Sequence, residues 1–137
     1  MRTLFKVLLL TLCLLLQPCV YAETKAGAVK WENYSTAIFA QAKQSHKLIL
    51  IYGKAVWCHW CQQMANTYKD PQVAETIKTH FIPVMVDVDK NADVADKYQI
   101  NDLPTLIILD ENNNVVQVFS GFIPPTDLNA KLQDVLK

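Results

Sequence analysis

The most constraining feature of this sequence is a pair of cysteines, Cys58 and Cys61, that closely follows a short apolar segment. Residues 47–52 are rich in isoleucine and leucine and are too few for a core helix, so they predict a strand buried on both faces. Met64 and Tyr68 suit a helix that opens at Cys58. A cysteine pair between a buried strand and a helix is typical of a redox-active dithiol.

The two cysteines are expected to do different chemistry. Two intervening residues at a helix start let both sulfurs come within bonding distance and leave the first at the helix terminus. Unpaired backbone N–H groups and the positive end of the helix dipole favour a thiolate there, so Cys58 is the expected nucleophile. Cys61, one turn further in, is expected to be the more buried thiol, which resolves a mixed disulfide. Both would be catalytic residues.

Three residues beside the cysteines, His59, Trp57 and Trp60, are expected to support this chemistry. A protonated His59 would lower the pKa of the Cys58 thiol and make the disulfide more oxidising. Alternatively, His59 is only an exposed residue with a modest effect on the thiol. Trp57 and Trp60 could serve ordinary packing, yet aromatic groups beside an exposed thiol also shape a shallow surface for extended substrates.

Residues 1–22 have the pattern of a signal peptide. The segment has a basic start, a largely apolar stretch over residues 7–16 and small side chains within residues 20–22, where signal peptidase requires them. We therefore expect cleavage before Glu23. The product would be a periplasmic or secreted protein whose one domain spans residues 23–137.

Two alternatives to simple cleavage remain for this segment. A retained membrane anchor would need about 20 consecutive apolar residues, and the apolar stretch here is roughly half as long. Lipid attachment at Cys19 would normally follow small residues, whereas Gln17 and Pro18 stand before it. Both alternatives rank below cleavage.

Charge and cysteine content change when the signal is removed. The signal carries two of the 13 basic residues and none of the 13 acidic ones, so the remaining chain has a net charge of about −2. That balance gives no electrostatic footprint for nucleic acid, and no basic amphipathic stretch indicates a membrane surface. Cys13 and Cys19 leave with the signal, so one cysteine pair remains. A pair that closes so short a loop stabilises a fold little, so its role is more chemical than structural.

Apolar periodicity and turn residues predict alternating helices and strands over the rest of the chain. A first helix is expected from residue 31 to about residue 46, a second opens at Cys58 and restarts at Asp70-Pro71, a short one covers residues 93–98, and the last follows Thr126 as its N-cap. The expected strands are residues 47–52, 81–88, 105–109 and 115–119. Gly53 is expected to end the first strand, and Gly121 the hairpin of the last two.

The motifs resemble those of the thioredoxin-like family over essentially the whole chain after the signal. The resemblance is closest to an exported branch of thiol:disulfide interchange proteins with a Trp-Cys-x-x-Cys-x-x-Met run, an Asp-Pro-x-Val segment and a Val-Asp-x-Asp strand end. These stand here as residues 57–64, 70–73 and 86–89. Residues 97–105 resemble the family's cis-proline loop. Resemblance and element order together predict an α/β, thioredoxin-like fold, a central mixed β-sheet with helices on both faces.

The resemblance also implies where substrate binds and where this chain departs from its family. A cis bond between Leu103 and Pro104 would bring the Leu103 backbone beside the first cysteine to pair with a substrate strand. The alternative is a trans proline that opens a strand. Tyr52 and Met85 stand where many cytosolic thioredoxins bury an aspartate and a lysine that move the proton of the second thiol. Water or His59 would serve instead.

Other uses of the cysteine pair are less well supported. A structural zinc site needs four ligands, and only His46, His59 and His80 remain to complete it. Haem attachment needs a histidine after the second cysteine, where Gln62 stands. Copper handling through the two cysteines, His59 and Met64 is chemically reasonable, and a redox-inert binding module stays open.

The sequence therefore predicts a monomeric thiol:disulfide oxidoreductase that uses no bound cofactor or metal. Its expected partners are exported proteins that carry disulfides, together with a membrane or soluble thiol donor that reduces the Cys58/Cys61 pair. We expect it to act as a reductant, although disulfide donation follows the same path in reverse and the redox potential decides the direction.

Overall fold

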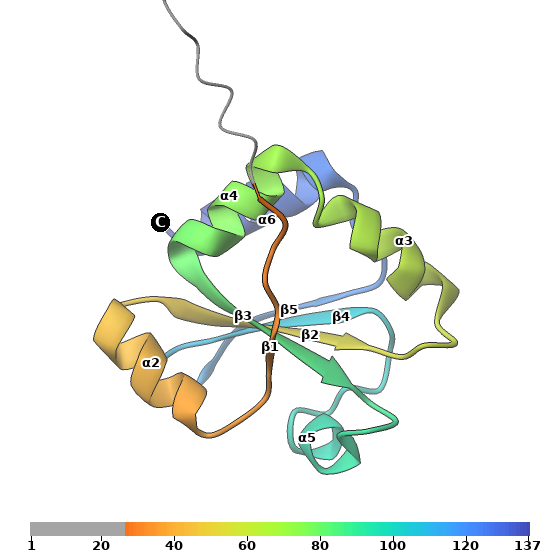
Figure 1. Ribbon diagram of the computed structural model, residues 1–137, viewed down its shortest axis with the longest axis horizontal. Coiled ribbons are helices and arrows are strands. Elements are labelled where there is room, and N and C mark those ends of the chain that lie inside the picture. Colours follow the sequence, from red (N-terminus) through yellow and green to blue (C-terminus); the bar gives the residue numbers. More distant parts are fainter. Residues whose placement is uncertain (1–26) are drawn as a thin grey trace, which may run out of the picture.

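The fold is built around β2 (Leu48–Lys54), the central strand of a five-stranded sheet (Figure 1). The computed structural model describes residues 27–137. The other strands are β1 (Glu32–Asn33), β3 (Phe81–Asp87), β4 (Thr105–Leu109) and β5 (Val115–Ser120). The helices are α2 (Ala37–Ser45), α3 (His59–Thr67), α4 (Pro71–His80), α5 (Ala92–Lys97) and α6 (Pro125–Val135). Apart from small shifts at their ends, the four expected strands are confirmed.

The expected signal peptide over residues 1–22, the cleavage site before Glu23 and the alternative lipid site at Cys19 lie outside the described residues. Within residues 27–137, no helix combines the length and the apolar character needed to cross a bilayer.

The strands lie in the order β1-β3-β2-β4-β5. β3 runs parallel to both β1 and β2, whereas β4 is antiparallel to β2 and to β5. The sheet therefore has a parallel part and an antiparallel hairpin edge. This is the mixed sheet that the order of elements predicts.

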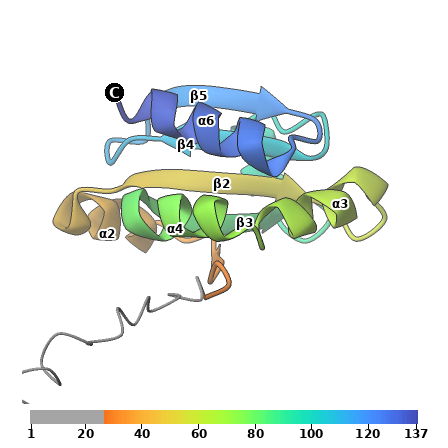
Figure 2. The ribbon, with the colours of Figure 1, turned by 90° about the horizontal axis from the view of Figure 1, so that it is seen from above.

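Two apolar cores lie on the two faces of the sheet. Helices α3, α4 and α6 cover one face (Figures 1 and 2), and α2 and α5 cover the other. β2 supplies Leu50 and Tyr52 to the first core and Ile49 and Ile51 to the second, and none of these side chains is more than 2% exposed. Because each buried aliphatic side chain stabilises the fold by about 1.5–3 kcal/mol, this strand anchors both layers.

Gly53 is part of β2, so the expectation that it ends the strand is wrong. It pairs with Val86 on one neighbouring strand and Thr105 on the other. A Cβ atom here would lie 2.8 Å from Cγ2 of Ile100, which is closer than two carbon atoms pack. Glycine lets the side chain of Ile100 sit against the strand backbone, just before the loop that carries Leu103.

The first helix begins at Ala37, so the expectation of a helix from Trp31 is also wrong. Part of the intervening segment forms β1, which pairs with Val84 and Met85. Trp31 packs against the core under α3, and Tyr34 packs against the opposite core. Their spacing of three fits one helix face, but the two side chains lie on opposite sides of the sheet.

The expected cap of α4 is confirmed and that of α6 is corrected. Oδ1 of Asp70 accepts hydrogen bonds from the backbone N–H groups of Gln72 (3.0 Å) and Val73 (3.2 Å), as an N-cap aspartate does. α6 begins earlier than expected, with Pro124 as its N-cap residue, and Thr126 lies within the first turn. The proline that follows Pro124 fits the first helical position because its missing N–H has no partner there.

Replacing Asp70 with Ala should lower the free energy of unfolding by about 1 kcal/mol, because two N–H groups at the start of α4 lose their acceptor. Urea unfolding followed by circular dichroism measures this change. The control is Glu75→Ala, which removes a carboxylate from an exposed position of the same helix and should cost less than about 0.5 kcal/mol. Equal losses from the two variants would show that the cap contributes nothing.

Candidate active site

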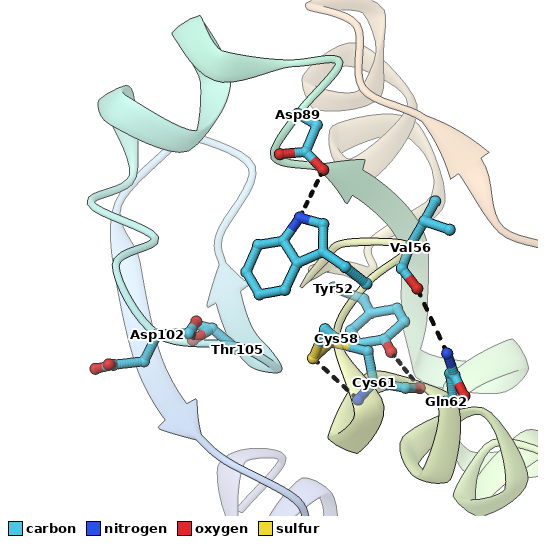
Figure 3. Close-up of a disulfide and its surroundings, with 9 residues drawn as sticks. Tyr52, Val56, Cys58, Cys61, Gln62, Asp89, Asp102 and Thr105 are labelled. Atoms are coloured by element: carbon cyan, nitrogen blue, oxygen red, sulfur yellow. Dashed lines mark hydrogen bonds between the residues drawn. A yellow bond between two sulfur atoms is a disulfide. The ribbon is translucent and has the colours of Figure 1, made fainter.

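Cys58 and Cys61 are joined as a disulfide at the start of α3 (Figure 3). Their Cα atoms are 5.2 Å apart, as the bond requires. Cys58 is the N-cap residue of the helix, and the backbone N–H of Cys61 donates to its Sγ over 3.1 Å. In the reduced protein this donor and the helix dipole favour a thiolate on Cys58. The helix start that the sequence predicts is confirmed.

The two cysteines differ less in exposure than the sequence predicts. Cys58 is 6% exposed and Cys61 is 4% exposed, so Cys61 is the more buried residue as expected, but Cys58 is not an exposed residue in the disulfide form. They differ in the openings that they border. Cys58 lines a front groove (residues 57–60, 88 and 100–103). Cys61 lines a rear cavity (residues 28, 29, 31, 52, 54–56, 61, 62, 65, 68, 69 and 85).

The front groove, with a volume of about 430 Å³, brings the cysteine segment and the loop before β4 together. Leu103 lines it, and the Leu103–Pro104 peptide bond is cis. Pro104 itself is buried outside the lining, and its carbonyl accepts a hydrogen bond of 2.8 Å from the N–H of Gly121. The Thr105 hydroxyl donates to the carbonyl of Asp102 over 2.6 Å (Figure 3). These bonds hold the loop opposite the disulfide.

Trp57 and Trp60 are both exposed, at 70% and 55%. The indole N–H of Trp57 donates to Oδ2 of Asp89 over 2.9 Å (Figure 3). The ring of Trp60 lies 5.8 Å from that of Phe122 and 5.6 Å from that of His59, measured between centroids. Grouped exposed aromatic side chains mark an interaction surface. The tryptophans therefore form the rim of the front groove instead of packing in the core.

Asp89 and Phe122 belong to this site, although the sequence did not single them out. The sequence showed Asp89 only as the last residue of the Val-Asp-x-Asp run. Its hydrogen bond with Trp57 depends on where β3 ends in space, which the sequence does not show. Phe122 follows Gly121, whose φ of +87° turns the chain after β5. The sequence did contain one sign of Phe122, namely that a large apolar residue stands directly after the glycine expected to end the hairpin.

The rear cavity is lined by both residues that stand where many cytosolic thioredoxins bury an aspartate and a lysine. Tyr52 and Met85 line this cavity of about 500 Å³ beside Cys61. The Tyr52 hydroxyl donates to the Cys61 carbonyl over 2.9 Å (Figure 3). Burial raises the pKa of Tyr52 to about 12. The hydroxyl therefore keeps its proton at physiological pH.

The three histidines considered as zinc ligands lie on separate elements. Among residues 27–137, no three or more His, Cys, Asp or Glu side chains are grouped as a metal site. His46 follows α2, His80 ends α4 and His59 begins α3. Met64 is fully buried in the core. The ligands considered for zinc are thus spread over three helices.

Comparison with known proteins identifies one matching family. The family profile Thioredox_DsbH, described as a protein of unknown function (DUF255), matches residues 15–116. No curated protein sequence matches the chain.

Solved structures with similar folds include three oxidoreductases or thioredoxins. A DsbH oxidoreductase has 22% identity and a TM-score of 0.73, over 88% of this chain and 92% of its own. A thioredoxin from Thermus thermophilus has 23% identity and a TM-score of 0.70, over 80% and 88%. A poplar thioredoxin h has 24% identity and a TM-score of 0.68, over 81% and 98%. The expected thioredoxin-like α/β fold is therefore confirmed.

In the reduced protein, Cys58 should react with iodoacetamide well below pH 8.5, about the pKa of a free cysteine, because its thiolate receives the Cys61 N–H and the helix dipole. Cys61 should stay largely unreactive. Alkylation rates against pH, assigned to each cysteine by peptide mass spectrometry, test this. A Cys58→Ser variant should lose the reaction at low pH, and equal rates for the two thiols would contradict the assignment.

Proposed function

Since this chain belongs to the Thioredox_DsbH family of thioredoxin-like proteins, we propose that it is a thiol:disulfide oxidoreductase that reduces protein disulfides in the cell envelope. The observation that carries the proposal is the Cys58–Cys61 disulfide at the start of α3, with Cys58 on the front groove. A dithiol at a helix terminus can pass two electrons to a substrate disulfide. Cys58 and Cys61 would be its catalytic residues.

The cycle begins when the Cys58 thiolate attacks one sulfur of a substrate disulfide. A new S–S bond joins Cys58 to the substrate, and the other substrate sulfur leaves as a thiolate and takes up a proton. Cys61 then loses its proton and attacks Sγ of Cys58, so the second substrate sulfur leaves in the same way. The substrate has gained two electrons and two protons, and the Cys58/Cys61 pair is oxidised.

The front groove suits an extended segment of a substrate protein. Leu103 and Cys58 both line the groove, so a segment in the groove would present its disulfide to the nucleophile. The backbone of the segment would pair with Leu103 as an added strand. Trp57 and Trp60, exposed at the rim, would contact its apolar side chains.

The proposed function requires that the protein is exported and that a thiol donor reduces it again. Support for export comes from the signal-like pattern of residues 1–22 and from the family match. A protein that reduces disulfides in an oxidising compartment must be reduced again after each turnover. A membrane or soluble thiol donor of the envelope would therefore supply electrons to the Cys58/Cys61 pair.

A Cys61→Ser variant should accumulate mixed disulfides with substrate proteins, because Cys58 still attacks but nothing resolves the product. Envelope extracts separated without reductant should show a ladder of larger species that collapses when reductant is added. The trapped partners would identify the substrates.

The matched control for this experiment is Cys58→Ser, which keeps Cys61 but should give no ladder. The same ladder from both variants would show that the assigned roles are wrong. If neither variant gives a ladder and the purified wild-type protein contains copper, a metal carrier that uses the same cysteines replaces the proposal.

Replacing His59 with Ala should raise the pKa of the Cys58 thiol and make the redox potential more reducing. A positive charge beside Cys58 stabilises the thiolate, so its loss destabilises the reduced form, by about 30 mV for each unit of Cys58 pKa. The potential is measured against glutathione at mildly acidic pH, where a histidine is charged. Gln63→Ala, an exposed change in the same helix, should leave it unchanged. An unaltered potential in the His59 variant would mean that this side chain only faces solvent.

A further inference from the structure

Resolution by Cys61 requires an acceptor for its proton. A thiol attacks a disulfide only as the thiolate, so the proton must leave before the S–S bond forms. Cys61 is 4% exposed, so the acceptor must reach it through the rear cavity, which it lines. His59 lines the front groove and not this cavity.

Among residues 27–137, the side chains that line the rear cavity include no carboxylate and no imidazole. Its charged groups are Lys54 and Lys69, and its other titratable groups besides Cys61 are Tyr52 and Tyr68. A lysine ammonium favours a nearby thiolate by its charge but has no capacity to accept a proton. Cys58, the remaining titratable neighbour, is bonded to the substrate at this stage.

The two tyrosines do not take the proton either. The Tyr52 hydroxyl already donates its only proton to the Cys61 carbonyl over 2.9 Å. The Tyr68 hydroxyl is buried without a hydrogen-bond partner. Burial raises the pKa of Tyr52 to about 12 and that of Tyr68 well above its ordinary value. Both side chains therefore stay neutral phenols throughout the cycle.

Solvent can reach the rear cavity. Its volume is about 500 Å³, and Val56, Gln62 and Ala65 in its lining are exposed. A cavity of this size, open at an exposed rim and bordered by polar groups, has room for several water molecules. Since no side chain that residues 27–137 place beside Cys61 is free to take the proton, water is the acceptor that remains.

Tyr52 ties the backbone of Cys61 to the central strand. Its ring packs against those of Trp31 and Tyr68, with centroids 5.4 Å and 5.0 Å away. Its hydroxyl extends to the first turn of α3, where it meets the Cys61 carbonyl (Figure 3). The central strand of the sheet therefore holds the backbone of Cys61 directly.

We propose that Tyr52 is a positioning residue that holds Cys61 against the rear cavity, and that water in this cavity takes the Cys61 proton during resolution. This inference rests on the exchange function proposed above. The Cys61 thiol gives its proton to water, and its thiolate forms the S–S bond with Cys58 as the bond between Cys58 and the substrate breaks. The substrate sulfur leaves with the electron pair and takes up a proton from solvent, so charge and protons balance.

Single-turnover kinetics with a small disulfide substrate separates capture by Cys58 from resolution by Cys61. Tyr52→Phe removes one hydroxyl and keeps the ring, so resolution should slow by roughly three- to tenfold. Capture, measured in a Cys61→Ser background, should be unchanged. The matched control is Tyr68→Phe, which removes a hydroxyl without a partner from the same aromatic cluster and should alter neither rate. Resolution at the wild-type rate in Tyr52→Phe would overturn the positioning role.

A second pair of variants tests the water route. Ala65→Met places a larger side chain at the exposed rim of the cavity, and should slow resolution several-fold without affecting capture. Gln63→Met is an equally exposed change in α3 outside the cavity lining, and should leave both rates unchanged. The wild-type resolution rate should rise with pH along one titration, that of Cys61. A further titration at lower pH, or an unaffected rate in Ala65→Met, would overturn water as the acceptor.

Different results would contradict the exchange function and the role of Tyr52 with the rear cavity. If the wild-type protein and the Cys61→Ser variant form no mixed disulfide, the exchange function itself is wrong. If capture proceeds but Tyr52→Phe and Ala65→Met both resolve at the wild-type rate, exchange stands and only the role of Tyr52 and the rear cavity is wrong.

Discussion

The burial of β2 on both faces is the constraint on which the rest of the structure depends. β3 and β4 pair with it on either side, and its end leads into Cys58. Because both neighbours are held in register with β2, the segment after β3 and the loop before β4 both reach the cysteines. Asp89 then accepts a hydrogen bond from Trp57, and Leu103 lines the same groove as Cys58. The position of the candidate site therefore depends on where β2 ends.

Apolar content and spacing predicted most of the sheet because both are local properties. Side chains of β3 alternate between the two cores, with Val84 in one and Phe81 in the other. Periodicity failed where too few residues carried it. The pair Trp31 and Tyr34 fits a helix face, but β1 forms because it pairs with β3, which is distant in the sequence. A local pattern holds no information about such a partner.

The candidate site divides in the same way. The place of Cys58 at the start of α3 could be predicted because the signals for a helix start are local. The two openings could not, since each is bordered by elements far apart in the chain. Tyr52 was visible only as a departure from a family pattern, and its hydrogen bond to Cys61 depends on how α3 packs on β2. Cys58 borders the front groove and Cys61 borders the rear cavity. This difference could not be predicted, because the shape of a groove or cavity depends on the packing of distant segments.

The front groove and the rear cavity share no lining residue, and this separation affects how such a protein can diverge. Changes in the loop before β4 alter the groove alone, whereas changes at Met85 or Ala65 alter the cavity alone. Under the proposed function, substrate preference rests on the groove and resolution on the cavity, so a substitution that changes one needs no compensating substitution in the other. Related proteins with the same cysteine pair would then adapt to different substrate segments without a change in how fast Cys61 resolves the mixed disulfide.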